Sequence, residues 1–242
     1  MVIDANGMHF KVLNEKIRDC NEDVIVNNCC GQRYIASGMN GKKITINGVP
    51  GNALAAYMGK STIVVNGNAQ DALGDTMNAG KIIVNGNAGD ACGYAMRGGK
   101  IFIRGNAGYR CGIHMKAYQE HKPTIVVGGK VGSFLGEYQA GGTIIVLGLG
   151  CEKGSLPVGN FCSTGMHGGA VYMCTDSVPS DLAPSIMVNE RTDEDLAEIK
   201  PVLEEYCADF GLDISDILKK KMYVFKPDVK NLYKAMYARN TI

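Results

Sequence analysis

In one-letter code, residues 82–100 read IIVNGNAGDACGYAMRGGK, and the following residues 101–116 read IFIRGNAGYRCGIHMK. The two stretches are copies of one pattern: a short β-branched run, a glycine, small residues, a second glycine and a methionine. Self-similarity at a short fixed period is typical of repeat architectures. The period is too short for two helices and a turn, and the copies lack a helix-length apolar pattern. The repeat therefore predicts one coil of a parallel β-helix.

The β-branched run recurs along most of the chain. Four consecutive copies begin at Ile44, Ile63, Ile82 and Ile101, which are 19 residues apart. The complete set of predicted strands is 24–27, 44–47, 63–66, 82–85, 101–104, 125–127, 144–147 and 171–174. Eight strands give about seven coils, and a strand spacing of about 4.8 Å makes the solenoid roughly 34 Å long. The usual hand of parallel crossovers predicts that it is right-handed.

Residues one period apart form columns, because they lie directly above one another in a solenoid. A methionine column is expected inside the coils, at Met39, Met58, Met77, Met96 and Met115. A second inner column is expected at Leu54, Leu73, Cys92, Cys111 and Leu135. Two asparagine columns are expected to cap turns as ladders, at Asn47, Asn66 and Asn85 and at Asn68, Asn87 and Asn106. Corners that need a positive φ or a close backbone approach are expected at Gly51, Gly89, Gly108, Gly132, Gly74, Gly93, Gly112 and Gly136.

Composition agrees with this fold and excludes several classes of protein. Glycine supplies 32 of the 242 residues, about twice its average usage of roughly 7%. With 25 basic and 24 acidic residues, the chain has no excess charge that would attract nucleic acid or an anionic membrane. No leader pattern and no membrane-length apolar segment are present, so a soluble cytoplasmic protein is expected. The nine cysteines, an odd number without a C-x-x-C pair, suit a reducing compartment.

The chain is predicted to consist of an N-terminal cap at residues 1–23, a β-helix at 24–178 and a helical C-terminal tail at 179–242. Residues 13–20 have the amphipathic character of a short helix that would cover the exposed edge of the first coil. A last helix is expected from Pro227 through Tyr237, since proline suits the first turn of a helix.

The tail also carries the signature of a longer helix. Thr192 and Asp195 resemble a capping box. Apolar residues then recur at helical spacing, at Leu196, Ile199, Leu203, Tyr206 and Cys207. The tail is therefore expected to pack on the solenoid or on a partner.

No catalytic, cofactor-binding or metal-binding residue is assigned. The loop from Gly86 to Gly93 follows a strand, but its spacing is G-x-x-G-x-x-x-G, no helix follows, and near-copies recur on neighbouring coils. The cysteines and histidines show no metal-ligand spacing, and His167 is expected at a surface corner. A stripe of lysines opens successive strands and is expected to be a solvated rim or a surface that faces a partner: Lys60, Lys81 and Lys100.

The coil residues resemble a known family. Residues 86–93, 96–101 and 105–112 are similar to the G-x-x-G-x-x-x-G repeats in the C-terminal domain of the glutamate synthase large subunit. Residues 136–148 and 165–172 resemble that domain as well, and the resemblance extends into the tail. In the bacterial enzyme this domain belongs to a very long polypeptide, whereas some archaea and anaerobic bacteria carry it as a separate subunit. A free-standing chain of this length resembles the separate subunit.

The resemblance implies a non-catalytic scaffold in a glutamate synthase complex. A glutamine amidotransferase subunit would release ammonia, and a subunit with FMN and an iron–sulfur cluster would use it to aminate 2-oxoglutarate reductively. The resemblance places these groups in the partners and none in this chain, whose second residue is Val2 and not a cysteine nucleophile. A homo-oligomer is left open.

Two other functions are weighed. One of the subunits of formylmethanofuran dehydrogenase carries similar glycine repeats and is also a scaffold. The Asn189 to Asp195 segment and the segment 28–38 favour glutamate synthase. The other hypothesis is a stand-alone enzyme with its site in a surface groove, for which the charged residues are too sparse: Asp71, Asp75, Asp90 and Arg104.

Overall fold

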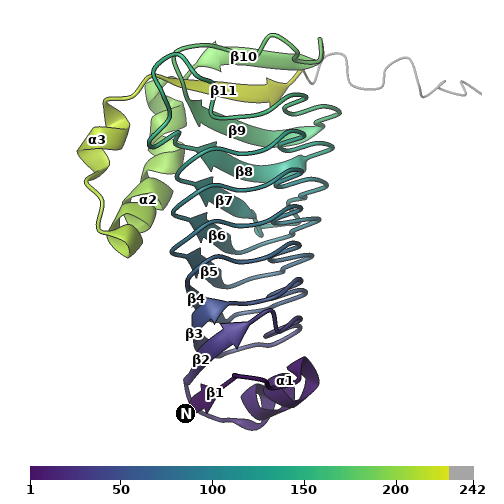
Figure 1. The fold of residues 1–242 in the computed structure, drawn as a ribbon. Helices are drawn as coiled ribbons and strands as arrows, with labels where there is room; N and C mark the ends of the chain where they lie inside the picture. Colours follow the sequence, from purple (N-terminus) through teal and green to yellow (C-terminus); the bar gives the residue numbers. More distant parts are fainter. Residues whose placement is uncertain (229–242) are drawn as a thin grey trace, which may run out of the picture.

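A computed structural model describes residues 1–228 of the chain. Its elements are β1 (Val2–Asp4), α1 (Phe10–Asp19), β2 (Val24–Cys30), β3 (Lys43–Val49), β4 (Thr62–Asn66), β5 (Lys81–Val84), β6 (Lys100–Ile103), β7 (Thr124–Val127), β8 (Ala140–Val146), β9 (Gly168–Cys174), β10 (Ile186–Glu190), α2 (Asp193–Phe210), α3 (Ile214–Leu218) and β11 (Met222–Pro227). Strands β1 to β9 rise as a column, and α2 and α3 lie along one side of it (Figure 1).

The strands form one sheet of eleven in the order β1 to β9, then β11 and β10. Strands β1 to β9 pair in parallel, each with the next along the chain. This confirms the predicted parallel solenoid and all eight predicted strand positions. β1 adds one parallel strand to the eight, because residues assigned to the cap pair with β2, from Val2 opposite Ile25 to Asp4 opposite Asn27.

The interior of the solenoid is filled by the predicted columns. The methionine column is fully buried from Met58 to Met115, and Met39 is 6% exposed. Leu54 to Leu135 form the buried column beside it. The strands supply two more columns of isoleucine and valine, and all of these residues belong to one hydrophobic cluster. The columns repeat because every coil presents the same backbone to the axis, so one residue size fits each level.

The glycine corners combine two physical causes. Gly74, Gly93, Gly112 and Gly136 have positive φ values between 62° and 69°, which glycine adopts without strain. Gly108 has no positive φ, but a Cβ there would lie 2.1 Å from Asp90 Oδ1 and 2.9 Å from Asp90 N on the coil below. The prediction of positive φ or close approach is therefore confirmed, with one cause at each kind of corner.

The same corner forces positive φ on residues other than glycine. Positive φ alternates along the coil, for example at Ala53, Ala55 and Tyr57 and again at Arg110, Gly112 and His114. The amide of Ala53 donates to the carbonyl of Asp71 on one neighbouring coil, and the amide of Ala55 donates to that of Ile35 on the other. Each corner is thus fixed by hydrogen bonds in both directions along the axis.

Both ends of the solenoid differ in part from the prediction. The N-terminal cap helix is confirmed as α1, with Leu13 and Ile17 buried. The C-terminal tail is not helical throughout: β10 and β11 pair antiparallel with each other, and β11 pairs with β9. Pro227 is the last residue of β11 and does not begin a helix. The rest of the helix predicted up to Tyr237 lies outside the described residues.

The long tail helix is confirmed and covers the outer face of the upper strands. α2 begins at the predicted capping box of Thr192 and Asp195. Its buried residues Ile199, Leu203, Tyr206, Cys207 and Phe210 pack in a second hydrophobic cluster with Ile83, Phe102, Val126, Ile145 and Tyr172 of β5 to β9. These strands are apolar on both faces because one face meets the coil interior and the other meets α2.

Candidate interaction surfaces

The predicted asparagine ladders are hydrogen-bonded stacks. Asn66 Nδ2 donates to Asn47 Oδ1 at 2.7 Å, and Asn85 Nδ2 donates to Asn66 Oδ1 at 2.9 Å. In the second ladder, Asn87 Oδ1 accepts from the amide of Asn106 at 2.8 Å, and Asn106 Oδ1 accepts from that of Lys130 at 2.7 Å. These asparagines use their polar groups on adjacent coils, which makes them structural.

The cysteines and histidines are dispersed over the fold. Residues 1–228 contain no group of three or more histidine, cysteine or acidic side chains placed to hold a metal ion. Cys92 and Cys111 are fully buried on adjacent coils, as predicted for core packing. Hydrogen bonding with Cys111 and burial raise the pKa of the Cys92 thiol well above its ordinary value. These two thiols are therefore poorly suited to act as nucleophiles.

The lysine stripe faces the protein's own tail over part of its length. Lys81 lies 2.7 Å from Glu205 Oε1 and 2.5 Å from Asp209 Oδ2, and Lys100 also pairs with Glu205. Lys81 Nζ sits 5.0 Å from the centre of the Phe102 ring. Lys60, one coil below, is exposed. The alternative of a purely solvated rim is thus wrong for Lys81 and Lys100, because α2 docks there.

Charge and burial oppose each other in this contact. Burial disfavours the Lys81 ammonium, but its hydrogen bonds to Asp209 and Glu205 outweigh that penalty and leave the pKa of Lys81 above its ordinary value. Burial likewise disfavours the Glu205 carboxylate, but the bonds from Lys100 and Lys81 leave the pKa of Glu205 below its ordinary value. Both residues are therefore charged at neutral pH, and α2 is held by ion pairs as well as by its apolar face.

Exposed rings gather on the corner of the upper coils. In one row, the Tyr94 and His114 rings lie 5.8 Å apart, His114 stacks on Tyr138 at 5.3 Å, and Tyr138 lies 6.5 Å from His167. In a second row, Arg110 sits 5.0 Å from the Phe134 ring, which stacks on Phe161 at 5.1 Å. We call the residues of both rows the aromatic edge.

The aromatic edge has the composition of a protein-binding surface. Tyr138 and Phe161 are 44% and 47% exposed although their rings are large and apolar. Aromatic residues and arginine are enriched where proteins bind one another. Sequence reasoning missed this surface, although one signal for it exists: the aromatic residues at 134 and 161, and the rings at 114 and 138, occupy coil positions filled by small residues in earlier copies. His167 was expected at a surface corner, and the structure puts its ring at the end of the first row.

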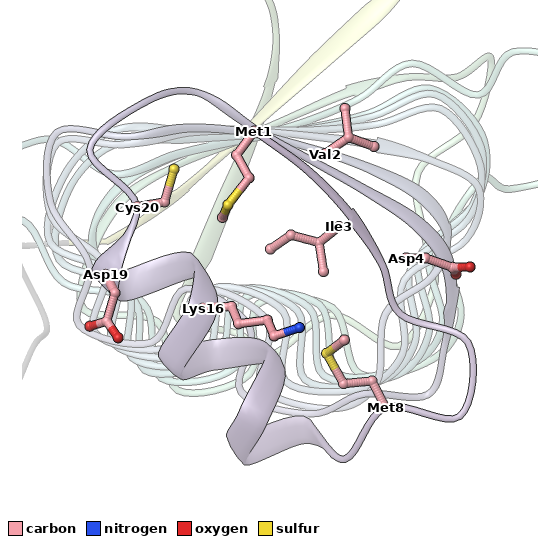
Figure 2. A pocket seen from close by; sticks show the side chains of 8 residues that line it. All are labelled: Met1, Val2, Ile3, Asp4, Met8, Lys16, Asp19 and Cys20. Carbon is pink, nitrogen blue, oxygen red and sulfur yellow. The ribbon is translucent and has the colours of Figure 1, made fainter.

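A second surface feature is the mouth of the solenoid at its N-terminal end. A cavity of about 590 Å³ opens there, lined by Met1, Val2, Ile3, Asp4, Met8, Lys16, Asp19 and Cys20. Figure 2 shows Ile3 and Met8 at the opening, with α1 lying across one side of the coils. β1 is the first strand of the sheet, so its outer edge has no strand partner among the described residues.

The repeat, the coil columns and the fold agree with one family. The GXGXG motif family matches residues 8–233, which is nearly the whole chain. This chain belongs to the GXGXG motif family. In the described part of this GXGXG protein, no helix is both long and apolar enough to cross a membrane.

Two known proteins resemble this GXGXG chain over most of its length. The uncharacterized protein MJ1350 of Methanocaldococcus jannaschii is 43% identical over 251 aligned residues, which cover 98% of this chain and 96% of that protein. A chain in the crystal structure of the formyltransferase/hydrolase complex FhcABCD of Methylorubrum extorquens, in complex with methylofuran, has a TM-score of 0.62 and 20% identity. The match covers 86% of this chain and 74% of that one and shows a common fold.

Proposed function

We propose that this GXGXG chain is a structural subunit of a multi-subunit oxidoreductase, and specifically of a glutamate synthase. Its role is to hold a glutamine amidotransferase subunit and a subunit with FMN and an iron–sulfur cluster at a fixed separation. The cofactors belong to the partners in this proposal. A rigid spacer suits such an enzyme because ammonia released at one site is lost if the second site is not held close.

The observation that carries the proposal is the aromatic edge on a corner that cannot deform easily. Its residues sit on backbone held by hydrogen bonds to the coils above and below, such as those from the His114 amide to Glu137 and from the Tyr138 amide to Thr164. Ordered rings on a rigid backbone lose little conformational entropy when a partner covers them. The family match and the glutamate synthase resemblance of the coil residues support the choice of enzyme.

A second candidate is a scaffold of the formylmethanofuran dehydrogenase type. It is favoured by the shared fold with a chain of a formyltransferase/hydrolase complex. Both candidates use the chain as a non-catalytic subunit and differ in the partners that it holds. A stand-alone enzyme remains the hypothesis of a different class.

The test is isolation of the tagged protein from its host, mass spectrometry of the eluate and an assay of glutamine-dependent glutamate formation. We expect an amidotransferase and a flavin protein in the eluate, with activity. Recovery of formyl-transferring subunits would favour the second candidate, and catalysis by the isolated chain would overturn both.

The interface is tested in the same preparation. The double variant Tyr138→Ser and Phe161→Ser should lose at least one partner about tenfold, as expected when hot-spot aromatics are removed. The control is Tyr57→Ser, because Tyr57 occupies the coil position of Tyr138 lower in the solenoid and is 61% exposed. Equal retention of all subunits by both variants would show that the aromatic edge is not the interface.

A further inference from the structure

The regular repeat is interrupted once in the upper coils, and the interruption forms one wall of a groove. Lys81 pairs with Lys100, 19 residues away, but Lys100 pairs with Thr124, 24 residues away, so this coil has five more residues. The extra residues form a tight hairpin in which the amides of Tyr118 and His121 donate to each other's carbonyls at 3.1 and 2.9 Å. The hairpin borders a groove of about 730 Å³, which we call the basic groove.

The floor of the basic groove is a column of residues one coil apart. Asn78, Arg97 and Lys116 follow one another at intervals of 19 residues, and Lys60 lies next to the same column lower down. The backbone under the charged side chains is fixed, since the amide of Arg97 donates to Met77 at 2.8 Å and that of Lys116 to Met96 at 3.0 Å. The cations are therefore carried on rigid coils and not on mobile loops.

The charge of the groove is unbalanced. Lys60, Arg97 and Lys116 are exposed and form no ion pair within residues 1–228, and the described lining contains no carboxylate. Like charges on neighbouring strands of a sheet are destabilising. The chain as a whole carries a net charge of only +1, so this cluster is a local feature. An anionic occupant would relieve the repulsion.

The spread of the charges indicates the shape of that occupant. From the level of Lys60 to that of Lys116 there are three coil intervals, roughly 14 Å at the strand spacing of about 4.8 Å. A single phosphate or carboxylate cannot reach both ends of such a row. An extended peptide rises about 3.3 Å per residue and covers this length with four or five residues. Three cations and one tyrosine ring make too small a basic surface for nucleic acid, whose binders neutralise many phosphates.

We propose that the basic groove receives an extended acidic segment of a partner subunit. The inference rests on the proposed function, because it supplies a second contact for the scaffold beside the aromatic edge. Arg97 and Lys116 pair with carboxylates of the segment, and Tyr118 on the hairpin packs against its side chains.

Binding to the isolated chain provides the first test. The probe is fluorescein-labelled octaglutamate, followed by fluorescence anisotropy at low salt and at 0.15 M salt. The double variant Arg97→Glu and Lys116→Glu should lose at least tenfold in affinity. The control variant Lys11→Glu and Lys130→Glu makes the same change in net charge at two exposed lysines outside the groove and should change affinity less than twofold. If charge reversal unfolds the chain, Arg97→Gln with Lys116→Gln takes its place.

Three results would overturn the inference: no binding of octaglutamate, an equal loss in both double variants, or tighter binding of octathymidylate than of octaglutamate, which would assign the groove to nucleic acid. The second test uses the complex isolated from the host. Loss of a subunit from the groove variant alone supports the docking role, and full retention overturns it while leaving the scaffold intact. If the wild-type chain recovers no subunits but binds octaglutamate through the groove, the scaffold fails and the acidic-peptide specificity stands.

Discussion

The hydroxyl of Tyr206 on α2 donates a hydrogen bond to the carbonyl of Ile103 at the end of β6, at 3.0 Å. The two residues are 103 positions apart in the chain, and both are buried. The Tyr206 ring also meets Phe102 edge-on at 5.5 Å and Phe210 at 4.7 Å. The tail is thus anchored to the outer face of the sheet by a polar and an aromatic contact at one point.

Removing the Tyr206 hydroxyl should weaken this anchor without opening a cavity. The Ile103 carbonyl keeps the amide of Gly128 as a donor at 2.8 Å, so Tyr206→Phe should lower the free energy of unfolding by only about 1 kcal/mol. Tyr206→Ala should lower it by about 3 to 5 kcal/mol because it leaves a cavity. Urea denaturation measures both. A Tyr206→Phe cost as large as that of Tyr206→Ala would show that packing contributes little.

The contact of Glu205 with the two lysines should make the tail sensitive to acid. The folded pKa of Glu205 lies below its ordinary value of 4.5, so its stabilising contribution is complete above pH 4.5 and is lost as the pH falls through the folded pKa. The pKa of Lys81 is raised from 10.5, so its contribution is complete below pH 10.5 and is lost only as the pH rises through the folded value.

Glu205→Gln should therefore lower the free energy of unfolding by about 1 kcal/mol at pH 7, a modest value because the pair is partly exposed. The difference from wild type should shrink below pH 4.5. Urea titrations between pH 3 and pH 7 measure it, with the exposed Glu15→Gln as the control. A difference that stays constant over this range would contradict the assignment.

Close approach between coils should make Gly108 intolerant of a side chain. The Cβ of Gly108→Ala would meet Asp90, whose Oδ1 accepts the amide of Tyr109 at 2.8 Å. We expect a loss of about 3 kcal/mol, the upper end for overpacking. Gly154→Ala is the matched control, since Gly154 has φ of 82° and nothing within 4 Å of a Cβ, so that only backbone strain of roughly 1 kcal/mol acts there. Equal losses by thermal or urea denaturation would argue against steric contact.

Thiol reactivity should separate the core cysteines from the surface. Burial raises the pKa of the Cys162 thiol to about 12, so roughly one part in ten thousand is thiolate at pH 8, and the thiolate is the reactive form. Cys30 is exposed. In the native chain at pH 8, Ellman's reagent should modify Cys30 in minutes and leave Cys92, Cys111 and Cys162 unmodified until denaturant is added. Mass spectrometry of digests identifies the sites, and early labelling of Cys162 would show that the upper coils open.

Periodic and local signals in the sequence were enough to predict the parallel solenoid, its strands and its inner columns. Every coil buries the same positions, such as Met58, Met77 and Met96, so the period is written directly into the residue types. The capping box of Thr192 and Asp195 and the apolar spacing after it likewise predicted α2, because both signals are local.

What the regular repeat meets on its outside follows from the tertiary structure alone. The strands β10 and β11 escaped prediction because their pairing with β9 joins segments far apart in the chain. The same holds for Lys81, whose partners Glu205 and Asp209 are more than 120 residues away, and for the ring contacts of the aromatic edge. A period specifies what stacks on the next coil, whereas contacts with the tail, the hairpin wall and the exposed rings depend on how non-repeating segments fold back on the solenoid.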